Sequence, residues 1–210
     1  APMHILDFIN AQMSESNACV VPLVGMKTNP EENTHVSDII GLAIFNKGIM
    51  VGQILGSAAR GCIYVTDQIK SGMLDVEVPG GSAQIEILKS KTSRSVKVGK
   101  DKKIALELSV QMQAGLAGKI TRRDLTAEKM IKLLEKETED LVKKEIKEAF
   151  AYSQEIQTDF FGVGNQVYKK KPKLWNELKK DWENHYPDVE LKIKVRVKLL
   201  GSGRLSKPVK

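Results

Sequence analysis

The feature that most restricts the fold is a long run of alternating residues in the middle of the chain. From Ile104 to Leu116 every second side chain is apolar, and the residues between them are mainly polar. Period two over this length predicts a β-strand in a sheet with one face buried. A second long strand is predicted over residues 83–98. The turn residues 99–102 between the two strands predict an antiparallel pair.

Shorter patterns predict the remaining elements. Further strands are expected over residues 18–24, 36–45, 49–51, 73–78 and 189–199. Helices are expected over residues 4–15 and 53–64, over 127–156 behind a Thr126 N-cap, and in shorter pieces over 160–185 that break at Pro172. The polar segment Lys27–His35 is expected to be a loop. Together these elements predict the α+β class: an antiparallel β-sheet with one long amphipathic helix and shorter helices packed on it.

The chain is expected to hold one large domain and a fragment of another. About 35 residues cannot bury a core alone, so residues 1–35 are expected to be the remnant or end of a preceding domain. Residues 36–207 are expected to form one domain, and residues 208–210 a loose tail. The start resembles no signal peptide, and we expect an N-terminal truncation. The sequence has no apolar run long enough to predict a membrane span.

Basic charge is concentrated near the C-terminus. Residues 166–210 hold 13 Lys or Arg against 5 Asp or Glu, whereas the first 165 residues hold 20 against 21. On the predicted last strand, one face carries Lys192, Lys194, Arg196 and Lys198. This face is a candidate contact for an anionic surface, either lipid or protein, and a simple solvated face is the alternative. Aromatic residues are only 5% of the chain, so binding of nucleic acid is not expected.

Residue types that carry catalysis or bind metal form no recognisable pattern. The histidines His4, His35 and His185 stand outside any zinc motif, and Cys19 and Cys62 are too far apart to suggest a metal site. Each cysteine is expected to be a small buried apolar residue rather than a reactive thiol. No catalytic, metal-binding or cofactor-binding residue is therefore predicted.

Two glycine-rich segments have the composition of phosphate loops but not their pattern. Gly162-Val163-Gly164 lacks the third glycine of a dinucleotide fingerprint, because Val167 stands in its place. Pro79-Gly80-Gly81 is not followed by Lys-Ser or Lys-Thr. Both segments are expected to be turns in which glycine adopts a positive φ.

Several segments in a particular order resemble one family. The segments are Gly41–Gly52, Arg60-Gly61, Ser71–Leu74, Pro79–Gly81, Ser90–Thr92, Asp159–Gly164, Trp175, Trp182, Tyr186-Pro187 and the alternating strand at 189–199. In this order and spacing the chain is similar to the C-terminal domain of the C subunits of spore germinant receptors, the GerAC/GerBC-type lipoprotein family. Two positions depart from the family pattern: Leu42 replaces a threonine, and Ala58-Ala59 replaces Glu-Thr.

The resemblance implies a non-catalytic lipoprotein subunit that is required for nutrient-triggered spore germination. Its implied partners are the A and B integral-membrane subunits of the receptor, and its implied place is the outer surface of the spore inner membrane. The anchoring lipid would lie outside this chain, because neither Cys19 nor Cys62 follows a signal sequence. A soluble, monomeric fragment that acts as a scaffold is expected. The alternatives are a domain that binds the germinant itself or, less consistent with the sequence, a basic nucleic-acid-binding protein.

Overall fold

A computed structural model gives the fold and describes residues 4–29, 34–79, 81–118 and 127–200. The chain forms two compact units. Unit 1 comprises residues 1–62, 95–107 and 145–192, and unit 2 comprises residues 63–94, 108–144 and 193–210. Five long elements run from one unit into the other, so each unit is assembled from segments that are distant in the sequence.

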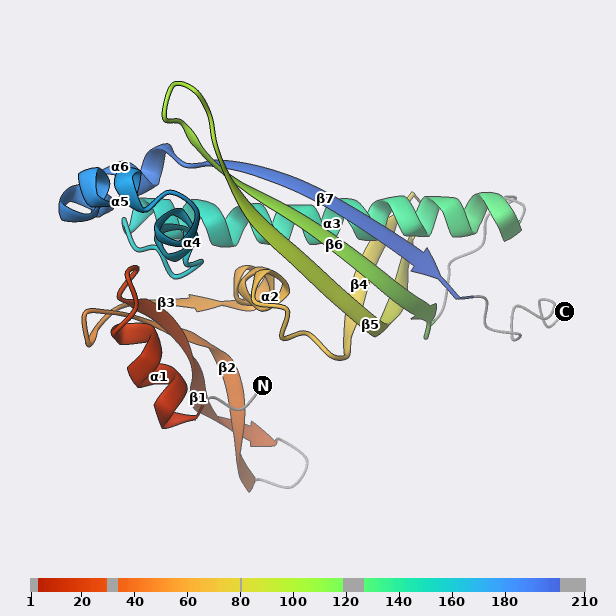
Figure 1. Cartoon of the computed structure of the whole chain (residues 1–210). Helices are drawn as coiled ribbons and strands as arrows, with labels where there is room; N and C mark the ends of the chain where they lie inside the picture. Colours follow the sequence, from red (N-terminus) through yellow and green to blue (C-terminus); the bar gives the residue numbers. More distant parts are fainter. Residues whose placement is uncertain (1–3, 30–33, 80, 119–126, 201–210) are drawn as a thin grey trace, which may run out of the picture. The chain divides into compact units, whose positions relative to one another are not determined.

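The first sheet belongs to unit 1. It consists of β1 (Ala18–Asn29), β2 (Thr34–Asn46) and β3 (Ile49–Leu55), paired antiparallel in the order β1-β2-β3. The helix α1 (Ile5–Gln12) lies beside this sheet, as Figure 1 shows in red. The ring of Phe8 meets that of Phe45 edge-on, with centroids 5.3 Å apart, and this contact attaches the helix to β2.

Two sequence predictions in this region are wrong. Residues 27–29 and 34–35 of the predicted loop Lys27–His35 belong to strands, because β1 and β2 stay paired as far as Asn29 opposite Thr34. Backbone hydrogen bonds hold such a ladder whatever the polarity of its side chains. The predicted helix 53–64 begins later, as α2 (Gly56–Val65), because residues 53–55 pair with β2 and continue β3. The predicted domain boundary at residues 35 and 36 falls within the β1–β2 pairing.

Short helices complete unit 1. They are α4 (Val163–Lys170), α5 (Pro172–Leu178), α6 (Trp182–His185), and the 3₁₀ turns η1 (Lys179–Asp181) and η2 (Tyr186–Asp188). The predicted break at Pro172 is confirmed, since Pro172 opens α5, where a missing N–H is tolerated. These helices enclose an aromatic core with ring centroids 4.7–6.0 Å apart, made by Phe150, Phe160, Phe161, Trp175, Trp182 and Tyr186.

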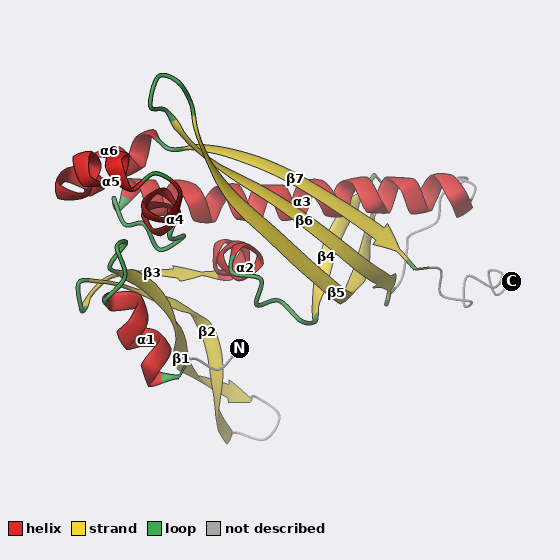
Figure 2. Cartoon of the chain, in the orientation of Figure 1, coloured by secondary structure: helices red, strands yellow, loops and turns green. Residues whose placement is uncertain are grey.

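The second sheet is the body of unit 2. Its strands are β4 (Gly72–Val78), β5 (Gly81–Val98), β6 (Ile104–Leu116) and β7 (Glu190–Leu199), in the order β4-β5-β6-β7. The long helix α3 (Ala127–Glu155) lies along one face of this sheet (Figures 1 and 2). The predicted α+β class with antiparallel pairing is confirmed. Thr126, the predicted N-cap, and residues 201–210 lie outside the described residues.

One strand pair in this sheet is parallel. The arrowheads of β6 and β7 point the same way in Figure 1. The connection between these two strands contains α3 and the short helices of unit 1, and a parallel pair needs a long crossover of this kind. The antiparallel prediction therefore holds for β4–β5 and for the β5–β6 hairpin, while β7 enters beside β6 in the other sense.

The alternation of β6 works as predicted. Leu108, Val110, Met112 and Ala114 are all buried, and Gln111 and Gln113 between them are exposed. In α3 the buried side chains are spaced four apart, at Leu134, Thr138 and Val142, which is the spacing of one helical face. The core of unit 2 therefore lies between this face of α3 and one face of the sheet.

Candidate functional site

The predicted basic row lies on β7 as expected. Lys192, Lys194, Arg196 and Lys198 are exposed, and they alternate with Leu191, Ile193, Val195 and Val197, which are half-buried or buried. Successive side chains of a strand point to opposite faces, so the four cations share the outward face. Lys192 differs from the other three, because its Nζ lies 3.9 Å from a carboxylate oxygen of Glu190.

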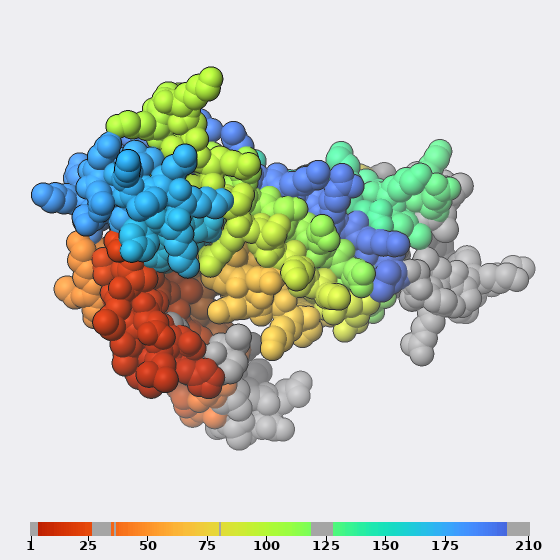
Figure 3. Space-filling model, in the orientation of Figure 1, coloured from red at the N-terminus to blue at the C-terminus, as the bar shows by residue number. Residues whose placement is uncertain are grey.

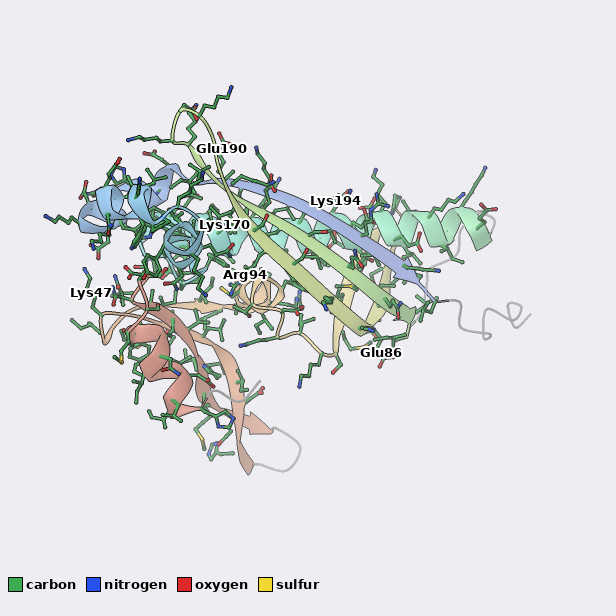
Figure 4. The ribbon with its side chains drawn as sticks, viewed as in Figure 1. Lys47, Glu86, Arg94, Lys170, Glu190 and Lys194 are labelled. Atoms are coloured by element: carbon green, nitrogen blue, oxygen red, sulfur yellow. The ribbon has the colours of Figure 1, made fainter. Side chains whose placement is uncertain are left out.

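The fold of unit 2 brings two further lysines to this face. A hollow of about 720 Å³ is lined by Lys89 and Lys91 of β5, Gln111 and Gln113 of β6, and Arg196 and Lys198 of β7, together with Met112, Val197, Glu135 and Glu139. In Figure 3 no helix covers these strands on the side facing the viewer. Figure 4 labels Lys194 on β7 and Glu86 and Arg94 on β5, the two strands that supply the cations. We call the hollow with its four cations the basic hollow.

Sequence reasoning missed Lys89 and Lys91 because the burial of β5 changes phase. Ile85 and Ile87 are buried at odd positions, but beyond Lys89 the next buried residue is Thr92. Both lysines therefore stand outward, although period two continued from Ile87 would bury them. The run of basic and hydroxyl residues after Leu88 is the one signal in the sequence that marks this change.

Two glutamates of α3 protect the free edge of β7. The carboxylate of Glu139 accepts a hydrogen bond from the backbone N–H of Val197 at 3.1 Å, and Glu135 accepts one from Leu199 at 2.9 Å. β7 is the last strand of its sheet, and an edge with free N–H groups invites pairing with another chain. The two side chains are one helical turn apart, which matches two residues along the strand.

A second polar centre lies in unit 1 around Asp159, whose side chain is 3% exposed. Its carboxylate accepts four hydrogen bonds, from Val163 N–H (2.8 Å), Gly164 N–H (2.7 Å), the Ser16 hydroxyl (2.8 Å) and the Trp182 indole N–H (3.1 Å). The two backbone donors belong to the first turn of α4, where N–H groups have no partner within the helix. Asp159 therefore closes the start of α4 and ties it to two distant segments.

Burial raises the pKa of Asp159 to about 6, against the opposing effect of its four donors. A polar pocket of about 120 Å³ lies next to it, with Lys47, Lys180 and Glu183 among its lining residues. Lys47 and Glu183 are paired at 2.6 Å. The pocket lacks the apolar walls typical of small-molecule sites, and it is smaller than they usually are. The arrangement of Asp159 is that of a structural connector.

The glycines beside Asp159 have two separate reasons. Gly162 has a φ of 70°, which confirms the predicted positive φ at this turn. Gly164 lies inside α4, and a Cβ there would lie 2.6 Å from the indole ring of Trp175. The absent side chain, rather than the turn, explains this second glycine. Gly80 of the other glycine-rich segment lies outside the described residues.

Arg60-Gly61 forms a tight contact with the part of α3 in unit 1. The guanidinium of Arg60 donates two hydrogen bonds to the buried carboxylate of Glu145, one of them at 2.8 Å from Nε. A Cβ on Gly61 would lie 2.1 Å from the carbonyl oxygen of Glu145. The pair therefore sets both the charge balance and the closeness of this helix crossing.

Reactive groups are sparse elsewhere. Cys19 and Cys62 are buried free cysteines, as predicted, and burial raises the pKa of the Cys62 thiol to about 12. Among the described residues, no three His, Cys, Asp or Glu side chains gather closely enough to hold a metal ion. Within the same residues, no helix is long and apolar enough to cross a membrane.

Comparisons with known proteins converge on one family. Residues 40–203 match the model of the family described as spore germination B3/GerAC like, C-terminal. The chain is 21% identical to spore germination protein KC of Bacillus subtilis (strain 168), over 99% of this chain and 54% of that protein. It is 24% identical to spore germination protein GerQC of Bacillus cereus, over 93% of this chain and 53% of that protein.

The fold also matches a solved structure. The crystal structure of the GerBC protein superposes with a TM-score of 0.77 at 19% identity, covering 95% of this chain and 61% of that one. The chain thus spans about half the length of the curated relatives that it matches. At this identity the superposition establishes the fold.

Proposed function

The chain belongs to the spore germination B3/GerAC-like C-terminal family, and from that premise we propose that it is the C-terminal module of a germinant receptor C subunit that binds partners without catalysis. The family match over residues 40–203 carries this proposal, because it includes most elements of both units. The partners would be the A and B integral-membrane subunits of the same receptor. The module would work as a scaffold at the outer surface of the spore inner membrane.

The chemistry of the described residues supports a role in binding. The carboxyl group with the strongest departure from its ordinary pKa, Asp159, is enclosed by four donors and is not open to a substrate. Both thiols are buried. A catalytic group must reach its substrate, and neither Asp159 nor the cysteines offer such access.

Membrane attachment would come from a lipid outside this chain, with the basic row on β7 as a weak second contact. Each basic residue near an anionic lipid surface contributes on the order of 1 kcal/mol, and salt screens this attraction. One acyl chain alone gives only marginal binding, so a second signal has a clear use. We expect the isolated chain to be monomeric and to bind anionic vesicles weakly and with strong dependence on salt.

The first test is nutrient-triggered germination of spores that lack the gene, with a non-nutrient trigger as the control. We expect loss of the response to one class of nutrient, with the control response intact, and recovery when the full-length gene is restored. An unchanged response to every nutrient in a strain that also lacks the paralogous genes would overturn the proposal. A thermal-shift screen with amino acids, sugars and nucleosides tests the alternative of germinant binding, which predicts a nutrient-specific rise in Tm.

A further inference from the structure

The basic hollow on unit 2 has an ordered arrangement of charge. Lys89 and Lys91 lie on β5, and Arg196 and Lys198 lie on β7, with β6 between the two strands. Neighbouring strands are about 4.8 Å apart, so the two pairs of cations form rails about 10 Å apart. Within each rail the cations are two residues, or about 7 Å, apart.

The floor between the rails is neutral and able to form hydrogen bonds. Gln111 and Gln113 stand on β6 and are exposed, and each carboxamide offers both donors and an acceptor. The floor therefore suits a ligand that itself has donors and acceptors at regular intervals. A polypeptide main chain in an extended conformation has this property.

The carboxylates in the hollow do not neutralise its cations. Glu135 and Glu139 accept hydrogen bonds from the edge N–H groups of β7, which holds them at the rim. Within the described part of the chain, none of the four cations takes part in an ion pair. Four cations against two carboxylates leave the hollow with a positive balance.

We propose that the basic hollow binds an extended acidic polypeptide segment of a partner protein, laid along β6 with its carboxylates on the two rails. This proposal rests on the proposed function as an interaction module and names the chemistry of one partner. Alternate side chains of an extended segment repeat at about 7 Å, which matches the spacing of cations along each rail. Its main chain would meet the amides of Gln111 and Gln113.

The shape of the site favours a peptide over a bilayer. A recess of about 720 Å³ accommodates a chain, whereas a flat bilayer surface touches the rim of a recess and leaves its floor empty. The row on β7 continues to Lys192 and Lys194, which lie outside the lining of the hollow. The hollow has no aromatic side chain on which a base could stack, so it does not suit single-stranded nucleic acid.

The test is fluorescence anisotropy of the chain with a labelled decapeptide of alternating Glu and Ser, and with the Gln-Ser peptide of the same length. We expect binding of the acidic peptide alone, weakening as salt increases. Lys89→Gln with Lys91→Gln should weaken binding about fivefold, and Arg196→Gln with Lys198→Gln by a similar factor. The matched control, Lys192→Gln with Lys194→Gln, removes the same charge from the same strand and should change affinity less than about twofold.

Equal weakening by the control pair, or equal binding of the two peptides, would overturn the proposal. Binding to vesicles of anionic phosphatidylglycerol without binding to the peptide would assign the face to lipid instead. Thermal unfolding of each variant shows that the fold is retained. Failure here is distinguishable from failure of the proposed function: a deletion that abolishes germination, beside peptide binding that ignores Lys89 and Lys91, would reject only the peptide site.

Discussion

Ser16 and Asp159 stand 143 positions apart in the chain, and the Ser16 hydroxyl donates a buried hydrogen bond of 2.8 Å to Oδ2 of Asp159. The contact joins the turn before β1 to the turn before α4, both in unit 1. Asn165 strengthens the same junction, because its side-chain oxygen accepts a hydrogen bond from the Ser16 backbone N–H. Ser16 precedes the residues that match the family model, so unit 1 is completed by residues outside that match.

Removal of the Ser16 hydroxyl should therefore weaken unit 1. Ser16→Ala leaves the buried carboxylate of Asp159 with one donor fewer, and we expect a loss of about 1–2 kcal/mol in the free energy of unfolding. Urea denaturation measures it. Ser82→Ala, an exposed serine of β5, should change stability by less than about 0.5 kcal/mol. Equal effects of the two changes would contradict the role given to Ser16.

The raised pKa of Asp159 predicts a specific dependence on pH. The folded-state pKa of about 6 exceeds the ordinary value of 3.8, so the folded state holds a proton that the unfolded state has released between these values. The stabilisation from this group is therefore full below pH 3.8, falls as the pH rises, and is lost above pH 6. The stability of wild type relative to Asp159→Asn should be about 2 kcal/mol greater at about pH 4 than at about pH 7.5.

Urea denaturation of the two proteins across this range measures the difference, and the other carboxyl groups cancel in the comparison. Parallel stability profiles for wild type and Asp159→Asn would show that Asp159 has the same pKa in the folded and unfolded states.

Gly61→Ala should separate α2 from α3. The new Cβ would lie 2.1 Å from the carbonyl oxygen of Glu145, and a backbone atom cannot rotate away as a side chain does. Overpacking of this kind costs about 1–3 kcal/mol, which thermal unfolding will register as a lower Tm. Gly72→Ala is the matched control, since its Cβ would meet one side-chain atom at an ordinary 3.9 Å. A Tm for Gly61→Ala that equals that of the control would refute the tight crossing.

Loss of Glu135 and Glu139 should expose the edge of β7. The double change to Ala removes the acceptors of the Val197 and Leu199 N–H groups, at a cost of about 1 kcal/mol each. The freed edge should also promote association, visible as larger species in size-exclusion chromatography with light scattering. Change of both residues to Gln keeps an acceptor and should preserve the monomer. Glu128→Ala, whose carboxylate pairs with Lys132 on the surface, serves as the control.

The thiols of Cys19 and Cys62 should react only after unfolding. Both side chains are buried, and burial raises the pKa of both thiols, that of Cys62 to about 12. The thiolate is the reactive form, so a colorimetric thiol reagent at about pH 8 should detect neither residue in the native protein and both in urea. Rapid reaction in the native state would show that the region around Cys19 or Cys62 opens readily.

Local pattern was enough to predict most elements of this protein. Alternation identified β6 and β7, a four-residue apolar spacing identified α3, and Pro172 marked the start of α5. These signals succeed because side-chain direction within a strand or helix depends only on neighbours a few positions away. The ends of β1 and β2 were missed, since cross-strand hydrogen bonds rather than side-chain polarity extend them.

The sequence by itself thus determined the α+β class, the outward row on β7 and the burial of both cysteines. Only the tertiary structure decided that Lys89 and Lys91 share a hollow with Arg196 and Lys198, and that Asp159 is enclosed by Ser16 and Trp182. The reason is physical. Contacts between distant segments depend on how the strands are ordered and where a buried phase shifts, and no local spacing in the chain encodes either.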